Sequence, residues 1–261
     1  MSHGNAGPAG GAMATLRKGD HVPEVARLQQ LLKDRGFQVA VDGEFGLKTK
    51  QAVQAFQSQD VDPHGEPLIV DGIAGPLTWW SLTHAKSSIV PASAVDYALM
   101  PQVESGGSQN GRRALGVAID EMKAGAGEIG GNNRGPYVVK YLNGLAPEGS
   151  SWCAAFVSWC FAQDPTGIPF RYTVGARDLL SQLKKRGWAR EPGAGYQPEP
   201  GDIVIWWRVR ADGWQGHTGL VHQVRDGRLY TVEGNRLPQV RGFSYVLSRI
   251  DKRLGYGHVP D

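Results

Sequence analysis

Apolar positions in the first third of the chain recur at the three- and four-residue spacing of amphipathic helices. One stripe ends at Gly36, a residue suited to the position after a helix C-terminus, and its members are Val25, Leu28, Leu31 and Leu32. Two further apolar stripes lie within residues 52–57 and 79–82. The pattern therefore predicts three short helices that form one small domain over residues 15–84.

The same segment contains an internal repeat. Residues 41–49 return as residues 70–78, with an offset of 29, and each copy places an Asp-Gly turn and a second Gly before a helix start. Pro76 suits a first helical position. Because these are turn and core positions, the repeat predicts how the domain folds rather than which of its faces binds a ligand.

The pattern changes after residue 110. Helical spacing is found in four segments, which are residues 112–122, 136–142, 152–161 and 176–185. After the Pro200-Gly201 turn, strands are predicted at residues 203–207, 218–224, 228–232, 243–247 and 254–259. Helices followed by antiparallel strands indicate an α+β domain over residues 111–261. Residues 1–14, rich in Gly and Ala, are expected to be a flexible leader, and residues 85–110 a linker.

Composition and charge narrow the class of protein. The 261 residues are 41% hydrophobic and 20% charged, which is enough apolar material for packed globular domains. The net charge of +3 favours an anionic polymer, whereas no Lys/Arg block is dense enough to indicate nucleic-acid binding. No run of 18 apolar residues indicates a membrane span, and the start lacks the basic-then-apolar pattern of a signal peptide.

The two cysteines differ in their placement. Cys153 and Cys160 are separated by about 10 Å of helical rise, too far for a disulfide, so both thiols are expected to be free. Cys153 falls at the start of its helix, after Ser150 and Ser151, which are expected to cap it. A helix N-terminus stabilises a thiolate, the nucleophilic form of cysteine, while Cys160 lies deeper between aromatic residues. The sequence thus makes Cys153 the candidate nucleophile and Cys160 a packing residue.

A histidine and two acceptors for it follow on neighbouring predicted strands. His217 stands at the entry to one strand, and the next strand ends with Glu233 and Asn235. A thiol nucleophile needs an imidazole to accept its proton, and the imidazole needs an acceptor that fixes its tautomer. His222 is at an odd spacing from His217 and should face the opposite side of the sheet. Either Glu233 or Asn235 satisfies the requirement for the third group.

Two resemblances follow from these motifs. Residues 15–84, with the doubled Asp-Gly motif, resemble the peptidoglycan-binding domain attached to many wall hydrolases. Residues 112–259 resemble the CHAP family of papain-like, cysteine- and histidine-dependent amidohydrolases and peptidases. The resemblance is carried by Trp-Cys-Ala-Ala-Phe-Val around Cys153, Gly-His-Thr-Gly-Leu-Val around His217 and Val-Glu-Gly-Asn at Glu233 and Asn235. The intervals of 64, 16 and 2 residues between these four positions fit the family.

The resemblance implies a peptidoglycan hydrolase that cuts an amide of the wall stem peptide or cross-link, with Cys153, His217, Glu233 and Asn235 as catalytic residues. No metal or other cofactor is required. Candidate substrate-binding residues are Trp152, Asn132, Asn133 and Trp214. The expected partner is bacterial peptidoglycan, without nucleic acid or membrane, and the chain is expected to be a monomer. Delivery to the wall would proceed by lysis, a holin or a specialised secretion system, with a cognate immunity or secretion partner if the protein is a toxin.

Two alternatives of other classes stay open at this point. One is a non-catalytic protein that only binds cell wall. The other is a cysteine protease or acyltransferase that acts on proteins. The wall-binding resemblance argues against a protein substrate, because such a domain would localise the enzyme on peptidoglycan.

Overall fold

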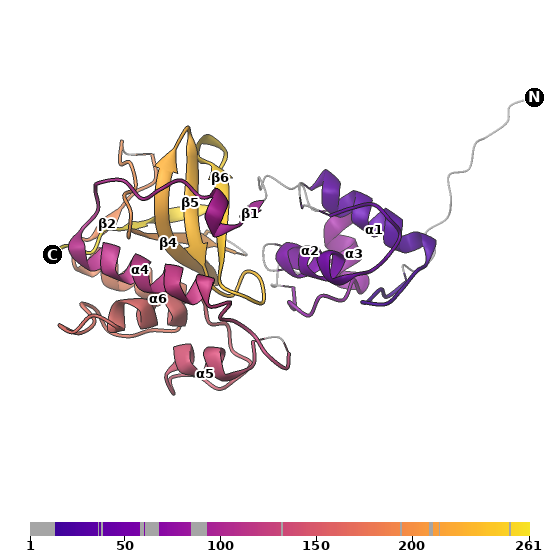
Figure 1. Cartoon of the computed structure of the whole chain (residues 1–261), viewed down its shortest axis with the longest axis horizontal. Helices are drawn as coiled ribbons and strands as arrows, with labels where there is room; N and C mark the ends of the chain where they lie inside the picture. The colour runs from indigo at the N-terminus through magenta and orange to yellow at the C-terminus, as the bar shows by residue number, and fades with distance from the viewer. Residues whose placement is uncertain are drawn as a thin grey trace, which may run out of the picture.

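A computed structural model describes residues 14–35, 37, 39–57, 60, 68–84, 93–131, 133–193, 195–208, 211–213, 215–250 and 252–261. Nearly all of the expected leader lies outside these ranges, as do residues 85–92 of the expected linker. Within the described ranges, no helix is long and apolar enough to cross a membrane. The chain forms two domains, a small helical one and a larger α+β one (Figure 1).

The helical domain has the three predicted helices, α1 (Pro23–Asp34), α2 (Leu47–Gln57) and α3 (Pro76–His84). Proline begins both α1 and α3, where its missing N–H and fixed φ carry no penalty. The apolar stripes of the three helices meet in one core, whose largest fully buried members are Trp79, Phe45 and Phe56. The helical pattern of the sequence therefore predicts this domain correctly.

The sequence repeat has a structural cause, which is a buried glutamine that holds each Asp-Gly loop. In the first copy, the Gln29 amide of α1 donates to the Asp42 carboxylate at 2.7 Å and to the Thr49 hydroxyl at 3.0 Å. The Gly43 N–H donates back to the Gln29 carbonyl oxygen at 2.9 Å. The second copy repeats this network with Gln57, Asp71, Thr78 and Gly72. Each helix thus fixes the loop that begins the next helix.

The larger domain is built on a seven-stranded sheet with the order β1-β6-β5-β4-β3-β7-β2, and all neighbouring strands are antiparallel. Its strands are β1 (Ser93–Val95), β2 (Ala189–Arg190), β3 (Ile203–Trp207), β4 (Gly216–Arg225), β5 (Arg228–Glu233), β6 (Arg241–Val246) and β7 (Arg253–Gly257). Short 3-10 helices follow β1 and β6, at η1 (Tyr97–Leu99) and η2 (Leu247–Arg249).

Four helices accompany this sheet, namely α4 (Gln109–Lys123), α5 (Pro136–Leu142), α6 (Cys153–Ala162) and α7 (Ala176–Lys185). Figure 1 shows α4 and α6 alongside the sheet and α5 beyond them. Apolar side chains of α4, α6 and α7 form the main core with inward residues of the central strands, among them Ile203, Ile205 and Leu220. The α6 helix is apolar on all sides because it lies inside this core.

The two edge strands, β1 and β2, are missing from the sequence prediction. Three- and two-residue strands carry too few positions to show an alternating pattern. Because β1 pairs with β6, the larger domain begins at residue 93, although residues 85–110 were expected to be a linker. Met100 packs directly on Gly242, since a Cβ added to this glycine would lie 2.5 Å from the Met100 sulfur. The Pro101 carbonyl oxygen is 2.8 Å from the His222 Nε2.

These contacts predict where the larger domain can be separated. A fragment of residues 93–261 should fold, whereas residues 108–261 should be less stable by at least about 3 kcal/mol. The shorter fragment loses the β1–β6 pairing, leaves a cavity at Met100 and removes the partner of the buried His222. Urea unfolding of the two fragments measures the difference, and equal midpoints would show that residues 93–107 do not stabilise the domain.

Candidate active site

Cys153 is the first residue of α6, as the sequence predicts, and its side chain is buried with 3% exposure. Within the described part of the chain, both cysteines are free thiols. The expected cap by Ser150 or Ser151 is wrong, because the N-cap residue is Trp152 and no side chain of its own caps the helix. A distant residue takes over this function: the Asn235 Oδ1 accepts a hydrogen bond from the Trp152 N–H at 2.9 Å.

His217, the second residue of β4, lies beside the thiol. Its Nε2 is 2.8 Å from the Glu233 Oε2, and its ring stacks on the Trp206 indole at 5.6 Å between centroids. A carboxylate only accepts hydrogen bonds, so Nε2 carries the proton of the neutral ring. The buried Nδ1 makes no conventional hydrogen bond to the described residues, which leaves its lone pair for the Cys153 thiol.

The pKa of Cys153 lies below its ordinary value, while that of Cys160 lies well above it. Burial is the largest influence on the pKa of Cys153 and opposes ionisation, but the neighbouring His217 and its charge, with further help from Arg208, outweigh burial. Cys160 is also buried, and the negative charge of the Glu121 carboxylate opposes its ionisation as well, so both effects raise the pKa of Cys160. The pKa values of the two thiols are therefore shifted in opposite directions, and we expect Cys153 to be the more reactive thiol.

Glu233 is fully buried at the end of β5 and accepts four hydrogen bonds. Oε2 accepts from His217 and, at 3.1 Å, from the Arg236 guanidinium. Oε1 accepts from the hydroxyls of Thr231 and Tyr245, each at 2.5 Å. Burial raises the pKa of Glu233, but Arg236 and these donors outweigh burial and bring its pKa to about 2. The carboxylate is therefore ionised throughout the physiological range.

Asn235 occupies a different place from Glu233. Its backbone is left-handed, with φ of 62°, a conformation that asparagine tolerates better than most residues. Besides holding the Trp152 N–H, its amide donates to the Asn133 Oδ1 at 2.5 Å. No described contact joins Asn235 to His217. The sequence left two partners open for His217, and the geometry pairs the imidazole with Glu233.

Two glycines make room for these contacts. A Cβ on Gly219 would lie 2.5 Å from the Glu233 Cγ, and one on Gly234 would lie 2.4 Å from the Trp152 indole. Both positions are in the sequence motifs around His217 and Glu233. The structure thus explains the Gly of each motif by close packing rather than by backbone flexibility.

The candidate substrate-binding residues differ in their exposure and in whether the structure describes them. The Trp152 side chain is completely buried, stacks on Tyr141 and donates to the Glu128 carboxylate at 3.1 Å, so the expectation that it contacts substrate is wrong. Asn133 lies in the loop before α5, is partly exposed, and accepts a hydrogen bond from the Asn235 amide at 2.5 Å. Asn132 and Trp214 lie outside the described residues. His222 packs on Tyr97 and Pro101 instead of joining the site.

Sequence reasoning missed four participants, which are Arg236, Tyr245, Glu128 and Arg208. Arg236 and Tyr245 hold Glu233, and Glu128 holds the Trp152 indole. Arg236 follows the Val-Glu-Gly-Asn motif directly, which is the one signal that pointed to it. The other three lie in separate segments, and only the folded chain brings them together.

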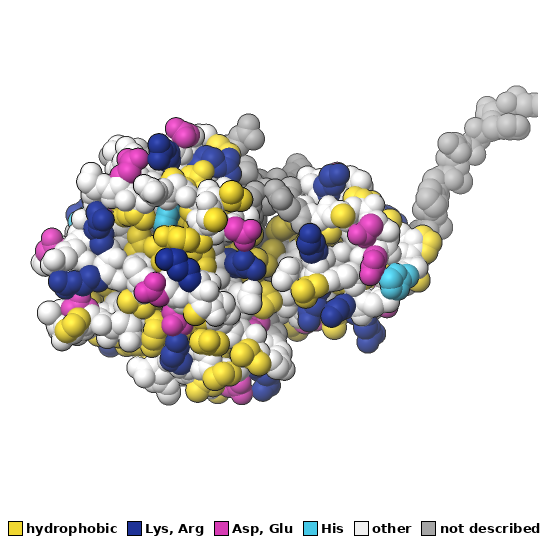
Figure 2. All heavy atoms as spheres, in the orientation of Figure 1, with side chains coloured by type: hydrophobic (Ala, Val, Ile, Leu, Met, Phe, Trp, Pro, Cys, Tyr) yellow, Lys and Arg dark blue, Asp and Glu magenta, His cyan; other side chains and the backbone are white. Residues whose placement is uncertain are grey.

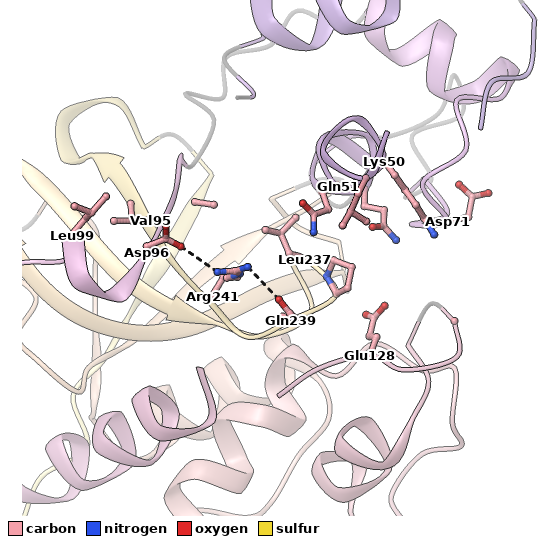
Figure 3. Close-up of a pocket in the computed structure, with 15 residues that line it drawn as sticks. Lys50, Gln51, Asp71, Val95, Asp96, Leu99, Glu128, Leu237, Gln239 and Arg241 are labelled. Atoms are coloured by element: carbon pink, nitrogen blue, oxygen red, sulfur yellow. Dashed lines mark hydrogen bonds and ion pairs between the residues drawn. The ribbon is translucent and has the colours of Figure 1, made fainter. Parts of the chain in front are cut away.

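A cavity of about 920 Å³ lies between the two domains (Figure 3). Cys153 and His217 are not among the residues that line it. The helical domain contributes Lys50, Gln51 and Asp71, and Leu237 of the larger domain packs against the helical domain's core. Glu128 lines the cavity from the other side and also bonds to the indole of Trp152, next to Cys153 in sequence. On the face seen in Figure 2, basic and acidic side chains are interspersed over both domains.

Comparisons with known proteins agree with this division. Residues 146–235 match the CHAP domain model, and residues 21–82 match the model described as a putative peptidoglycan binding domain. The chain therefore contains a helical peptidoglycan-binding domain followed by an α+β CHAP domain, which confirms both resemblances and the predicted fold class. A search of curated proteins found no match.

Among solved structures, the chain is similar to two proteins over part of its length. One is described as a Burkholderia AP3 phage endolysin, with 29% identity, a TM-score of 0.24, and coverage of 47% of this chain and 41% of that one. The other is described as Ly7917, with 18% identity, a TM-score of 0.33, and coverage of 57% and 62%. The chain thus spans less than two thirds of either protein.

Proposed function

We propose that this protein is a peptidoglycan hydrolase that cuts an amide bond of the wall peptide with Cys153 as nucleophile. The proposal is carried by one observation: a helix-terminal thiol, an imidazole and a buried carboxylate meet inside the CHAP domain. The adjoining peptidoglycan-binding domain supports bacterial wall as the polymer on which this group acts.

In the proposed first step, His217 Nδ1 accepts the Cys153 proton and the thiolate attacks the amide carbonyl carbon. Glu233, which accepts from Nε2–H, stabilises the imidazolium that forms. The carbonyl oxygen becomes an oxyanion, and we assign the Cys153 N–H, which has no intrahelical acceptor at the helix N-terminus, to hold it. Collapse of this intermediate breaks the C–N bond, and the imidazolium gives its proton to the departing amine.

The thioester left on Cys153 is then hydrolysed. His217 removes a proton from water, the hydroxide adds to the thioester carbonyl, and the thiolate leaves and is reprotonated. The products are one carboxylic acid and one amine, and the enzyme returns to its starting state. Asn235 acts as a positioning residue in this scheme, because it holds the backbone of Trp152 and with it the start of α6.

Digestion of purified sacculi followed by mass spectrometry tests the proposal. We expect soluble fragments with new amino groups and intact sugars, and the position of the new amine identifies a muramoyl–alanine amidase or an endopeptidase. Release of fragments with new reducing ends, or no release at all, would contradict the proposal. Wall binding without release would favour the purely wall-binding alternative, and cleavage of proteins alone would favour the protease.

The helical domain should raise activity only on the insoluble polymer. Fragment 93–261 should cut soluble muropeptides at the rate of the full chain and lose about 10-fold or more on sacculi, since tethering raises local concentration. Turbidity loss of sacculi and chromatography of muropeptides give the two rates. Equal rates on sacculi would remove the targeting role.

A wall hydrolase of this kind would serve as an endolysin or as an interbacterial toxin, and a toxin would have a cognate immunity partner.

A further inference from the structure

Arg208 is a half-buried cation beside the candidate site, and the proposed mechanism does not use it. It directly follows β3, and its N–H donates to the carbonyl of Gln215, two residues before His217. Trp206 pairs with His217 across β3 and β4, and Arg208 lies two residues after Trp206, so strand alternation puts its side chain on the His217 face of the sheet. Burial lowers its pKa, yet arginine stays charged at any physiological pH.

Within the described part of the chain, the buried Nε of the Arg208 guanidinium has no hydrogen-bonding partner. Glu233 does not supply one, because its two oxygens already accept from four other donors. A buried donor left unpaired destabilises the fold, so a partner that arrives with a ligand would recover this loss.

The charge balance of the site points in the same direction. Two guanidiniums, Arg208 and Arg236, face a single carboxylate, Glu233, and proton transfer from Cys153 to His217 leaves the sum unchanged. The Glu128 carboxylate lines the interdomain cavity instead, and burial raises its pKa. Arg236 is thus paired with Glu233, whereas the charge of Arg208 is not matched by an ion pair among the described residues.

We propose that Arg208 is a substrate-binding residue that pairs with a carboxylate of the wall peptide next to the amide that is cut. This inference rests on the proposed function and adds a preference to it. A guanidinium binds a carboxylate through paired, charge-assisted hydrogen bonds, and a neutral carboxamide cannot replace that anion. The enzyme would therefore distinguish wall peptides with free carboxylates from those in which these groups are amidated.

Two synthetic stem peptides, one with free carboxylates next to the cut bond and one with carboxamides, test this preference. Wild-type enzyme should favour the carboxylate form by about 10- to 100-fold in kcat/KM, as expected for one charge-assisted pair. Arg208→Gln should lose this preference by slowing only the carboxylate form, and Arg208→Lys should keep part of it. Arg225→Gln is the matched control, since Arg225 ends β4 and pairs at the surface with Glu104 at 3.3 Å.

An equal loss on both peptides in Arg208→Gln, together with a shifted pH profile of Cys153 alkylation, would overturn the inference and show that Arg208 only supports the thiolate. An unchanged preference would overturn it as well. Binding of both peptides to Cys153→Ala, with and without Arg208→Gln, provides a readout that needs no turnover. If wild-type enzyme cuts neither peptide nor wall, the proposed function fails, while the binding comparison still decides whether Arg208 takes a carboxylate.

Discussion

Cys153→Ala should abolish wall hydrolysis, with turnover falling by at least about 10⁴-fold, while folding and wall binding persist. The substitution removes the sulfur that faces His217 and leaves the helix, the Asn235 contact and the helical domain in place. Turnover on sacculi, thermal unfolding and sedimentation with wall separate the three properties. A Cys153→Ala protein that lyses wall at the wild-type rate would end the cysteine-hydrolase proposal.

Cys160→Ala is the matched control, because it removes the same atom from the same helix two turns further on. Cys160 is buried with 1% exposure, so its loss should cost roughly 1 kcal/mol of stability and little turnover. Limiting iodoacetamide should label Cys153 first, and at pH values below the ordinary thiol range, since its pKa is lowered and that of Cys160 is raised. His217→Ala should slow this labelling, whereas His222→Ala should not.

The sequence predicts the helices and central strands well because most carry a periodic apolar pattern and the others, such as α6 and β3, are continuous apolar runs. The α7 helix was predicted at its observed bounds, and its apolar face and basic last turn account for that. The strands β1 and β2 were missed because their pairing is set by the neighbouring strands β6 and β7 rather than by their own residues. Local pattern thus predicts long elements, and tertiary contacts decide short ones.

The candidate site shows the same limit. Cys153 and His217 stand out because a helix start and a strand entry give them distinctive settings. The choice between Glu233 and Asn235 depends on which side chain reaches the imidazole, and two residues two positions apart cannot be separated by spacing alone. Trp152 was expected to contact substrate, but its side chain is buried in the core, packed against Gly234. The Arg208 position depends on strand pairing and has no sequence motif.

Glu233→Gln should lower turnover by about 10³-fold or more, and Asn235→Gly by about 10-fold. Glutamine keeps the size of Glu233 but removes the charge that stabilises the His217 imidazolium and permits the wrong tautomer. With the imidazolium less stable, the thiolate is less stable too, so Cys153 alkylation should require a higher pH. Asn235→Gly keeps the left-handed backbone and removes the hydrogen bonds to Trp152 and Asn133 but none to His217, so the alkylation profile should stay near that of the wild type.

Loss of folding must be separated from loss of chemistry, since Glu233→Gln leaves the buried Arg236 without its carboxylate. Glu121→Gln is a suitable control, because Glu121 also pairs with a cation, Lys140 at 2.7 Å, and with a tyrosine hydroxyl, but at a distance from the thiol chemistry. It should lower the unfolding midpoint and leave turnover per folded molecule unchanged. If Asn235→Gly instead proves the more damaging variant and raises the pH required for alkylation, then asparagine, and not Glu233, orients the histidine.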